Sequence, residues 1–170
     1  MSRSIISPYL LPDPYMPMQY FIEGMLSGAP ASYATGSWNA ANRALYTPVI
    51  FPCDATLYAL NARSNSATGN YDLGLYDPDM NRIASKGSTA NAAAKITLTL
   101  PEVRVYAGYT YWQALVFSST SSFYRSIVDD TLMAIAMGLA MEDSALPLPA
   151  TMTPVLSTTT QIPLHSFGVR

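Results

Sequence analysis

The sequence predicts an all-β protein, an antiparallel, jelly-roll-like β-sandwich with extended proline-rich arms at both ends of the chain. Short segments of alternating apolar and polar residues, separated by turn residues and without helical periodicity between them, lead to this prediction. At 170 residues, the chain is long enough for one domain with a sizeable core. We expect an N-terminal arm over residues 1–35, a sandwich core over 36–128, and an apolar, proline-rich extension over 129–170 that packs on the core or on a partner.

The predicted N-terminal arm combines closely spaced prolines with large apolar side chains. Prolines at this density prevent a helix and favour extended or polyproline II backbone. A disordered linker would be polar, whereas this segment is rich in large apolar side chains that must be covered. We therefore expect it to lie either on another molecule or folded back over its own domain. The candidate interaction residues of the arm are Tyr9, Tyr15, Met16, Met18 and Tyr20.

The clearest hairpin signal lies between Gly69 and Gly87. Residues 71–76 alternate in the period-2 pattern of a half-buried strand, and residues 82–86 lead out again as a second strand. Between them, Asp77-Pro78-Asp79 predicts a tight turn, because proline presets φ and aspartate accepts hydrogen bonds from its own backbone.

Further strand candidates follow at regular spacing, and each is bounded by turn residues or prolines. They are residues 44–51, 56–62, 95–100, 109–117, 123–128 and 161–167. Pro48 confines the first to a sheet edge or a bulge, and Pro101 ends the third. Residues 109–117 form the longest aromatic-rich strand, which we expect at the centre of a sheet, whereas 161–167 is an edge candidate. Residues 131–141 fit a buried turn of helix and an irregular apolar stretch equally well.

Charge is scarce in this chain. Charged residues make up 12% of it, about half the ~25% usual for soluble proteins, while 49% of residues are hydrophobic. Either neutral polar side chains solvate the surface or partners cover much of it. Twelve tyrosines and nine methionines favour the second explanation, because interface cores are enriched in these residues. We therefore expect a homo-oligomer, with a trimer favoured.

Nucleic acid and membrane are not expected partners. The net charge is −2 and the basic residues are scattered singly. The longest apolar run, residues 132–141, is too short for a bilayer that needs ~20 residues. The N-terminus has no continuous apolar region of a secretory signal, and the lone Cys53 is expected to be a small buried hydrophobe. These features predict a protein made in a reducing cytoplasm.

No set of residues predicts catalysis, a metal site or a cofactor. The segment from Asp77 begins like a calcium loop but has Arg82 and Ser88 where glycine and glutamate are needed. His165 is the only histidine, and the paired carboxylates at 129–130 and 142–143 flank loops, so structural roles are favoured. Trp38 and Trp112 complete the candidate interaction residues; with Tyr76, Tyr109 and Tyr111 they are also candidates for stacking on sugar rings.

Several short motifs carry a resemblance to a known class of proteins. They are Gly36-Ser37-Trp38, Asn42 to Pro48, Asp72 to Asp77, Asn81 to Ser85, Gly108 to Trp112, and Leu146 to Thr151. Over residues 36–151 the chain resembles tailed-bacteriophage virion structural proteins, in particular jelly-roll capsid decoration (cement) proteins. The resemblance implies a non-enzymatic protein of the virion that stabilises the head shell by binding the major capsid protein or other virion proteins. The alternative is a receptor-binding or fibre-associated module that recognises host-surface glycan.

Overall fold

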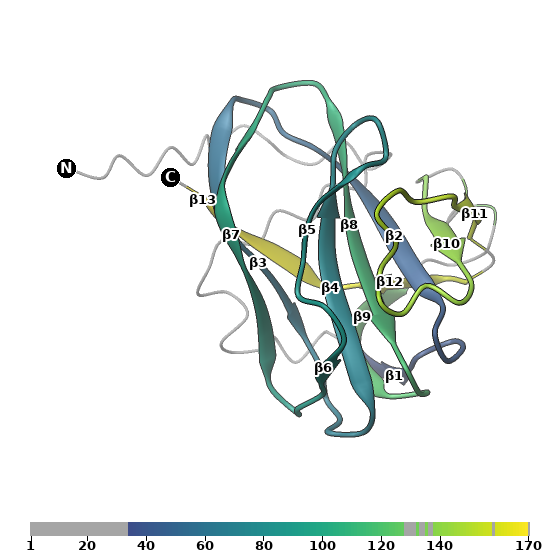
Figure 1. Ribbon diagram of the computed structural model, residues 1–170. Helices are drawn as coiled ribbons and strands as arrows, with labels where there is room; N and C mark the ends of the chain where they lie inside the picture. Colours follow the sequence, from purple (N-terminus) through teal and green to yellow (C-terminus); the bar gives the residue numbers. More distant parts are fainter. Residues whose placement is uncertain (1–33, 128–131, 133–134, 136–137, 158, 170) are drawn as a thin grey trace.

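The computed structural model describes residues 34–127, 132, 135, 138–157 and 159–169, so nearly all of the predicted N-terminal arm lies outside the described residues. The described chain forms antiparallel β-sheets, which confirms the predicted fold class (Figure 1). The strands are β1 (Ala34–Ser37), β2 (Ala44–Ile50), β3 (Ala55–Arg63), β4 (Asn70–Tyr76), β5 (Arg82–Ser85), β6 (Thr89–Ala90), β7 (Lys95–Val105), β8 (Thr110–Phe117), β9 (Ser122–Ile127), β10 (Ala140–Glu142), β11 (Val155–Leu156), β12 (Gln161–Pro163) and β13 (His165–Val169).

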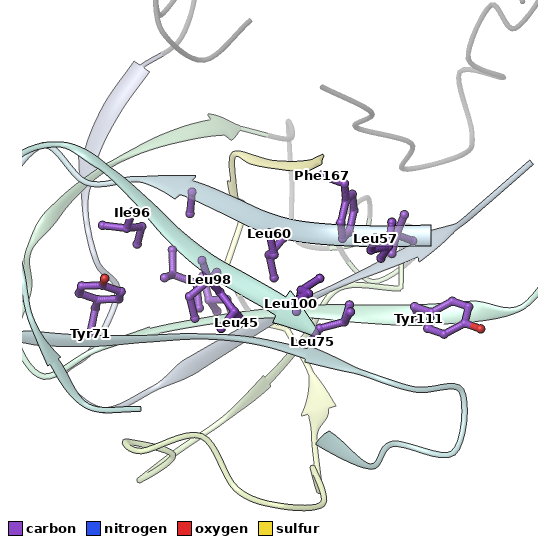
Figure 2. Close-up of a cluster of buried hydrophobic side chains, with 14 of the residues drawn as sticks. Leu45, Leu57, Leu60, Tyr71, Leu75, Ile96, Leu98, Leu100, Tyr111 and Phe167 are labelled. Carbon is purple, nitrogen blue, oxygen red and sulfur yellow. The ribbon is translucent and has the colours of Figure 1, made fainter. Parts of the chain in front are cut away.

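The main core lies between two layers. One layer is a seven-stranded sheet in the order β11-β10-β2-β8-β4-β5, with β6 also paired to β4; the other is the three-stranded sheet β13-β3-β7. Leucines and aromatic side chains from both layers point toward one another in the space between them (Figure 2). A further three-stranded sheet, β1-β9-β12, adds Phe123 to this core.

The predicted hairpin is present as β4, a turn and β5. The carboxylate of Asp77 accepts hydrogen bonds from the amides of Asp79 (2.9 Å) and Asn81 (2.8 Å), so aspartate closes the turn as expected. The expectation of a half-buried strand is wrong, because Asp72 and Tyr76, on the face predicted to be solvated, are also fully buried. A later segment of the chain covers that face.

Pro48 and Pro101 have different effects on the strands that contain them. Pro48 lies in β2 opposite Trp112 of β8 and beyond the part of β2 that pairs with β10, which ends at Tyr46, so β8 is the one strand paired with it among the described residues. Pro101 does not end its strand, since β7 continues to Val105. Leu57 pairs with Val103 and Ala59 with Thr99, so β7 bulges around Pro101.

The C-terminal region is part of the folded domain. Strand β13 pairs with β3 and places Phe167 in the main core, so the core extends well past residue 128. Residues 139–157, called the cover segment below, pack on the second face of the seven-stranded sheet. This second core consists of Ala44, Tyr46, Tyr76, Ala114 and Val116 from the sheet, with Ala140, Ala145, Leu148 and Met152 from the cover segment.

A buried carboxylate fixes the cover segment to the sheet. Asp72, in β4, accepts hydrogen bonds from the amides of Leu148 (3.0 Å) and Gly87 (2.9 Å), while Arg82 donates to the carbonyl of Leu148. Burial raises the pKa of Asp72, and the two backbone amides act in the opposite direction. The hydroxyl of Tyr76 adds a hydrogen bond to the carbonyl of Pro149 (2.7 Å).

Candidate interaction surface

The candidate interaction residues of the arm, Tyr9, Tyr15, Met16, Met18 and Tyr20, lie outside the described residues. Trp38 lies in the main core with 1% of its surface exposed. Its ring makes edge-to-face contacts with Phe117 (5.0 Å between centroids) and Phe123 (4.7 Å), and its Nε1 donates to the carbonyl of Arg43 (2.8 Å). In this conformation Trp38 stabilises the domain and is not available to another molecule.

The remaining aromatic candidates separate by exposure. Trp112 is half-buried and packs against the second core. Tyr76 and Tyr111 are buried, whereas Tyr109 is 59% exposed. Of the aromatics considered for sugar stacking, Tyr109 is therefore the one whose ring is mostly open to solvent.

Three turns meet at one end of the sandwich, which we call the loop end. They are residues 51–54 between β2 and β3, residues 77–81 between β4 and β5, and residues 106–109 between β7 and β8. The pairing places them together, because Ile50 lies opposite Thr110, Tyr76 opposite Trp112, and Ala55 opposite Val105. These turns are at the top of the molecule in Figure 1.

Exposed apolar side chains gather at the loop end. Tyr106 (49%) and Tyr109 (59%) project from the turn between β7 and β8, and Met80 (40%) projects from the turn between β4 and β5. Val169 (50%) lies at the same end of the other layer, since it pairs with Leu57. The other large exposed hydrophobics among the described residues are Leu132, Val155 and Leu156.

Hydrogen bonds hold the loop end in one shape. The amide of Gly108 donates to the carbonyl of Phe51 (3.1 Å), and the amide of Ala107 donates to the carboxylate of Asp54 (3.0 Å). These bonds connect the turn between β7 and β8 to the turn between β2 and β3. The two exposed tyrosines are thus presented on tethered backbone, which lowers the ordering cost of binding.

A cation and a hydroxyl support the same turn. Arg104 lies over the ring of Tyr106 (5.5 Å from guanidinium carbon to centroid) and pairs with Asp54 at 3.5 Å. The hydroxyl of Tyr111 accepts a hydrogen bond from the amide of Tyr106 (3.2 Å). Charge around the tyrosines is therefore balanced locally, and the aromatic surface is the distinguishing feature of the loop end.

Sequence reasoning missed this surface for identifiable reasons. Tyr109 was expected within a strand that shares its face with Tyr111, but β8 begins at Thr110 and leaves Tyr109 in the turn. Tyr106 was not singled out at all. The prediction that Cys53 is buried is wrong, because it lies exposed in the turn between β2 and β3. The pattern Tyr106-Ala107-Gly108-Tyr109, with a turn dipeptide between tyrosines, was the available signal.

The ionisable groups considered for chemistry have structural contacts. Glu142 accepts hydrogen bonds from the hydroxyl of Tyr46 (2.9 Å) and from Thr153, and Asp143 pairs with Arg43 at 2.5 Å. His165 is fully buried, which lowers its pKa to about 3, and within the described residues neither ring nitrogen has a hydrogen-bond partner.

Among the described residues, no cluster of three or more His, Cys, Asp and Glu side chains could hold a metal ion. No helix in that part of the chain is long and apolar enough to cross a bilayer. Compared with known proteins, the chain matches no family model, no curated protein and no solved structure.

Proposed function

We propose that this protein is a non-enzymatic structural protein that binds other proteins of an assembly through its loop end. The observation that carries the proposal is the pair of exposed tyrosines, Tyr106 and Tyr109, on a turn tethered to its neighbours. Tyrosine is enriched at protein interfaces, and contiguous exposed apolar side chains mark interaction sites. The structural contacts of Glu142, Asp143 and Asp72 support a role without catalysis.

The assembly that we propose is a tailed-phage virion, in which the protein decorates the head shell and stabilises it. This part of the proposal rests on the resemblance of residues 36–151 and on the charge-poor composition. The major capsid protein is the proposed partner. A protein that binds only the assembled shell shifts the equilibrium toward that shell, which is how decoration would stabilise it.

Binding to phage heads tests this function directly. Purified protein is added to heads of a phage that encodes it, stripped of the protein, and bound copies are measured after sedimentation. Tyr106→Ser/Tyr109→Ser should weaken binding by about 30-fold or more, because aromatic hot spots contribute about 2 kcal/mol or more. Leu156→Ser is the matched control, since Leu156 is 60% exposed but lies on β11, away from the loop end. Absence of parent binding to the heads would refute the decoration role.

Glycan recognition is the second candidate function, and the exposed ring of Tyr109 favours it. A sugar ring would stack on that face while Asp54 and Arg104 supply polar contacts. A glycan array, read with the parent and with Tyr109→Ser, separates the two functions. Specific binding of a bacterial surface polysaccharide that is lost in Tyr109→Ser would favour the receptor-binding alternative over decoration.

A further inference from the structure

The tyrosines of the loop end have a suitable ligand within this chain's own sequence. We infer that the loop end binds the proline-rich segment of residues 8–17 from a second copy of the protein. The inference deepens the proposed function, because it names the contact that would join neighbouring copies in the assembly. It rests on the exposed aromatic surface, the proline spacing of the segment, and the length of chain before β1.

The segment has the sequence of a polyproline II ligand. Residues 8–17 contain Pro14-Tyr15-Met16-Pro17, which is the P-x-x-P spacing. A polyproline II helix repeats every three residues, so Pro14 and Pro17 would lie on the same edge. Such segments dock on exposed aromatic side chains and lose little conformational entropy, since their backbone is stiff before binding.

The loop end offers the matching surface. The amide of Tyr109 donates to the carbonyl of Tyr106 (3.5 Å), so one tight turn carries a tyrosine at each end. Met80, on the turn between β4 and β5, adds an apolar side chain at the same end. Asp13 is the only charged residue in the segment, and the cation beside Tyr106, Arg104, is already paired with Asp54. The contact would therefore be mainly apolar.

The chain between the segment and the domain is long enough to reach a neighbour. Residues 18–33 separate Pro17 from β1, and 16 residues span up to roughly 55 Å when extended. Each copy then offers one segment and one loop end, which are different surfaces. Contacts of this head-to-tail kind close into a ring when the rotation between copies allows it, in agreement with the expected trimer.

The test uses the full-length protein and its single cysteine. Cys53 is exposed in the turn between β2 and β3, so an environment-sensitive fluorophore on its thiol reports on the loop end. We expect the emission and the sedimenting mass to change together as concentration rises. A synthetic peptide of residues 8–17 should compete, returning the mass to that of a monomer while keeping the label in its bound environment.

Variants identify the two sides of the contact. Pro14→Ser/Pro17→Ser and Tyr106→Ser/Tyr109→Ser should each raise the dissociation constant for self-association at least tenfold, whereas Leu156→Ser should leave it unchanged. A mixture of the two double variants should form a one-to-one pair, because one keeps the tyrosines and the other keeps the prolines. This rescue would not occur if Pro14→Ser/Pro17→Ser acted by unfolding the domain, because that variant supplies the loop end of the pair.

Two results would overturn the inference. One is self-association that neither double variant nor the peptide changes. The other is a monomer at all concentrations whose Cys53 label responds to Pro14→Ser/Pro17→Ser, because the segment would then bind its own domain. Both are measured on purified protein alone, so failure here is distinguishable from failure to bind phage heads.

Discussion

The two ends of the sandwich are closed by different chemistry. At the end opposite the loop end, the carbonyl of Thr68 accepts hydrogen bonds from Ser121 (2.7 Å), Asn91 (3.3 Å) and Ser119 (3.4 Å). Asn70 continues this network: its backbone amide donates to the hydroxyl of Ser118 (2.8 Å), and its side-chain amide donates to the hydroxyl of Ser88 (3.2 Å). We call this the polar end; it lies at the bottom of Figure 1. The loop end uses backbone hydrogen bonds and leaves aromatic rings in solvent.

This difference separates stabilisation from binding. At the polar end, short hydroxyl and amide side chains bind the neighbouring turns, so their polar groups are used within the domain. At the loop end, backbone amides of the turn between β7 and β8 donate to the Phe51 carbonyl, the Asp54 carboxylate and the Tyr111 hydroxyl. The exposed rings of Tyr106 and Tyr109 therefore contribute little to holding that turn. Substitutions at the polar end should therefore lower the free energy of unfolding, and substitutions of the loop-end tyrosines should lower affinity only.

Acid should open the half of β13 that lies nearer the polar end. The pKa of His165 is about 3 in the folded chain and 6.5 ordinarily, so the unfolded chain binds the proton more readily. Stability is fully present above pH 6.5 and is lost as the pH falls toward 3, by on the order of 4 kcal/mol. The raised pKa of Asp72 acts with the opposite sign, because folding there favours the protonated form.

Hydrogen exchange followed from pH 7 to pH 4 checks this effect. Amides of β13 near His165 and of its partner Ala62 should lose protection before the turn between β7 and β8. His165→Leu should remove most of the dependence. Equal loss of protection at both ends would argue against a local effect of this histidine.

Asp72→Ala measures a polar contact that water cannot replace. The substitution leaves the amides of Leu148 and Gly87 without their acceptor in a buried site. We expect it to lower the free energy of unfolding by about 3 kcal/mol, because the loss of the acceptor outweighs the gain from removing a buried carboxylate. Asp143→Ala is the matched control, because its ion pair with Arg43 is exposed to solvent and exposed ion pairs contribute little to stability. Urea unfolding gives both values, and similar values would contradict the role of Asp72 in holding the cover segment.

Gly69→Ala tests the polar end itself. Gly69 has a φ of +73°, and a Cβ there would lie 2.5 Å from the hydroxyl of Ser118, which binds the amide of Asn70. We expect a loss of about 1–2 kcal/mol in the free energy of unfolding. Gly108→Ala is the control at the loop end, since its φ is +80° but no atom lies within 4 Å of the added Cβ. Gly69→Ala should lower the free energy of unfolding more than Gly108→Ala does.

Tyr109→Ser should change the free energy of unfolding by less than about 0.5 kcal/mol, because the ring is mostly in solvent. The same substitution should weaken partner binding. Thermal unfolding at a concentration that favours the monomer measures the effect on the stability of the domain without a contribution from binding. A large loss of stability would show that Tyr109 supports the loop end as well as binding there.

Local patterns in the sequence predicted the longer strands and the central position of β8, but not the short strands β1, β6, β10 and β11. The hairpin of β4 and β5 follows from the residues around Asp77, and β8 lies at the centre because its long apolar run suits a strand paired on both sides. The burial of Asp72 could not be predicted, because the cover segment lies more than 60 residues away in sequence. The loop end was missed for a related reason, since only the pairing of distant strands brings its turns together.

At the bulge around Pro101, strand β7 loses the flat edge that an additional strand would need. β7 is the last strand of its sheet, and Glu102 there has a φ of 54°. Two molecules meeting along β7 cannot align a continuous ladder of hydrogen bonds, so crowded copies resist growth into fibrils along this edge.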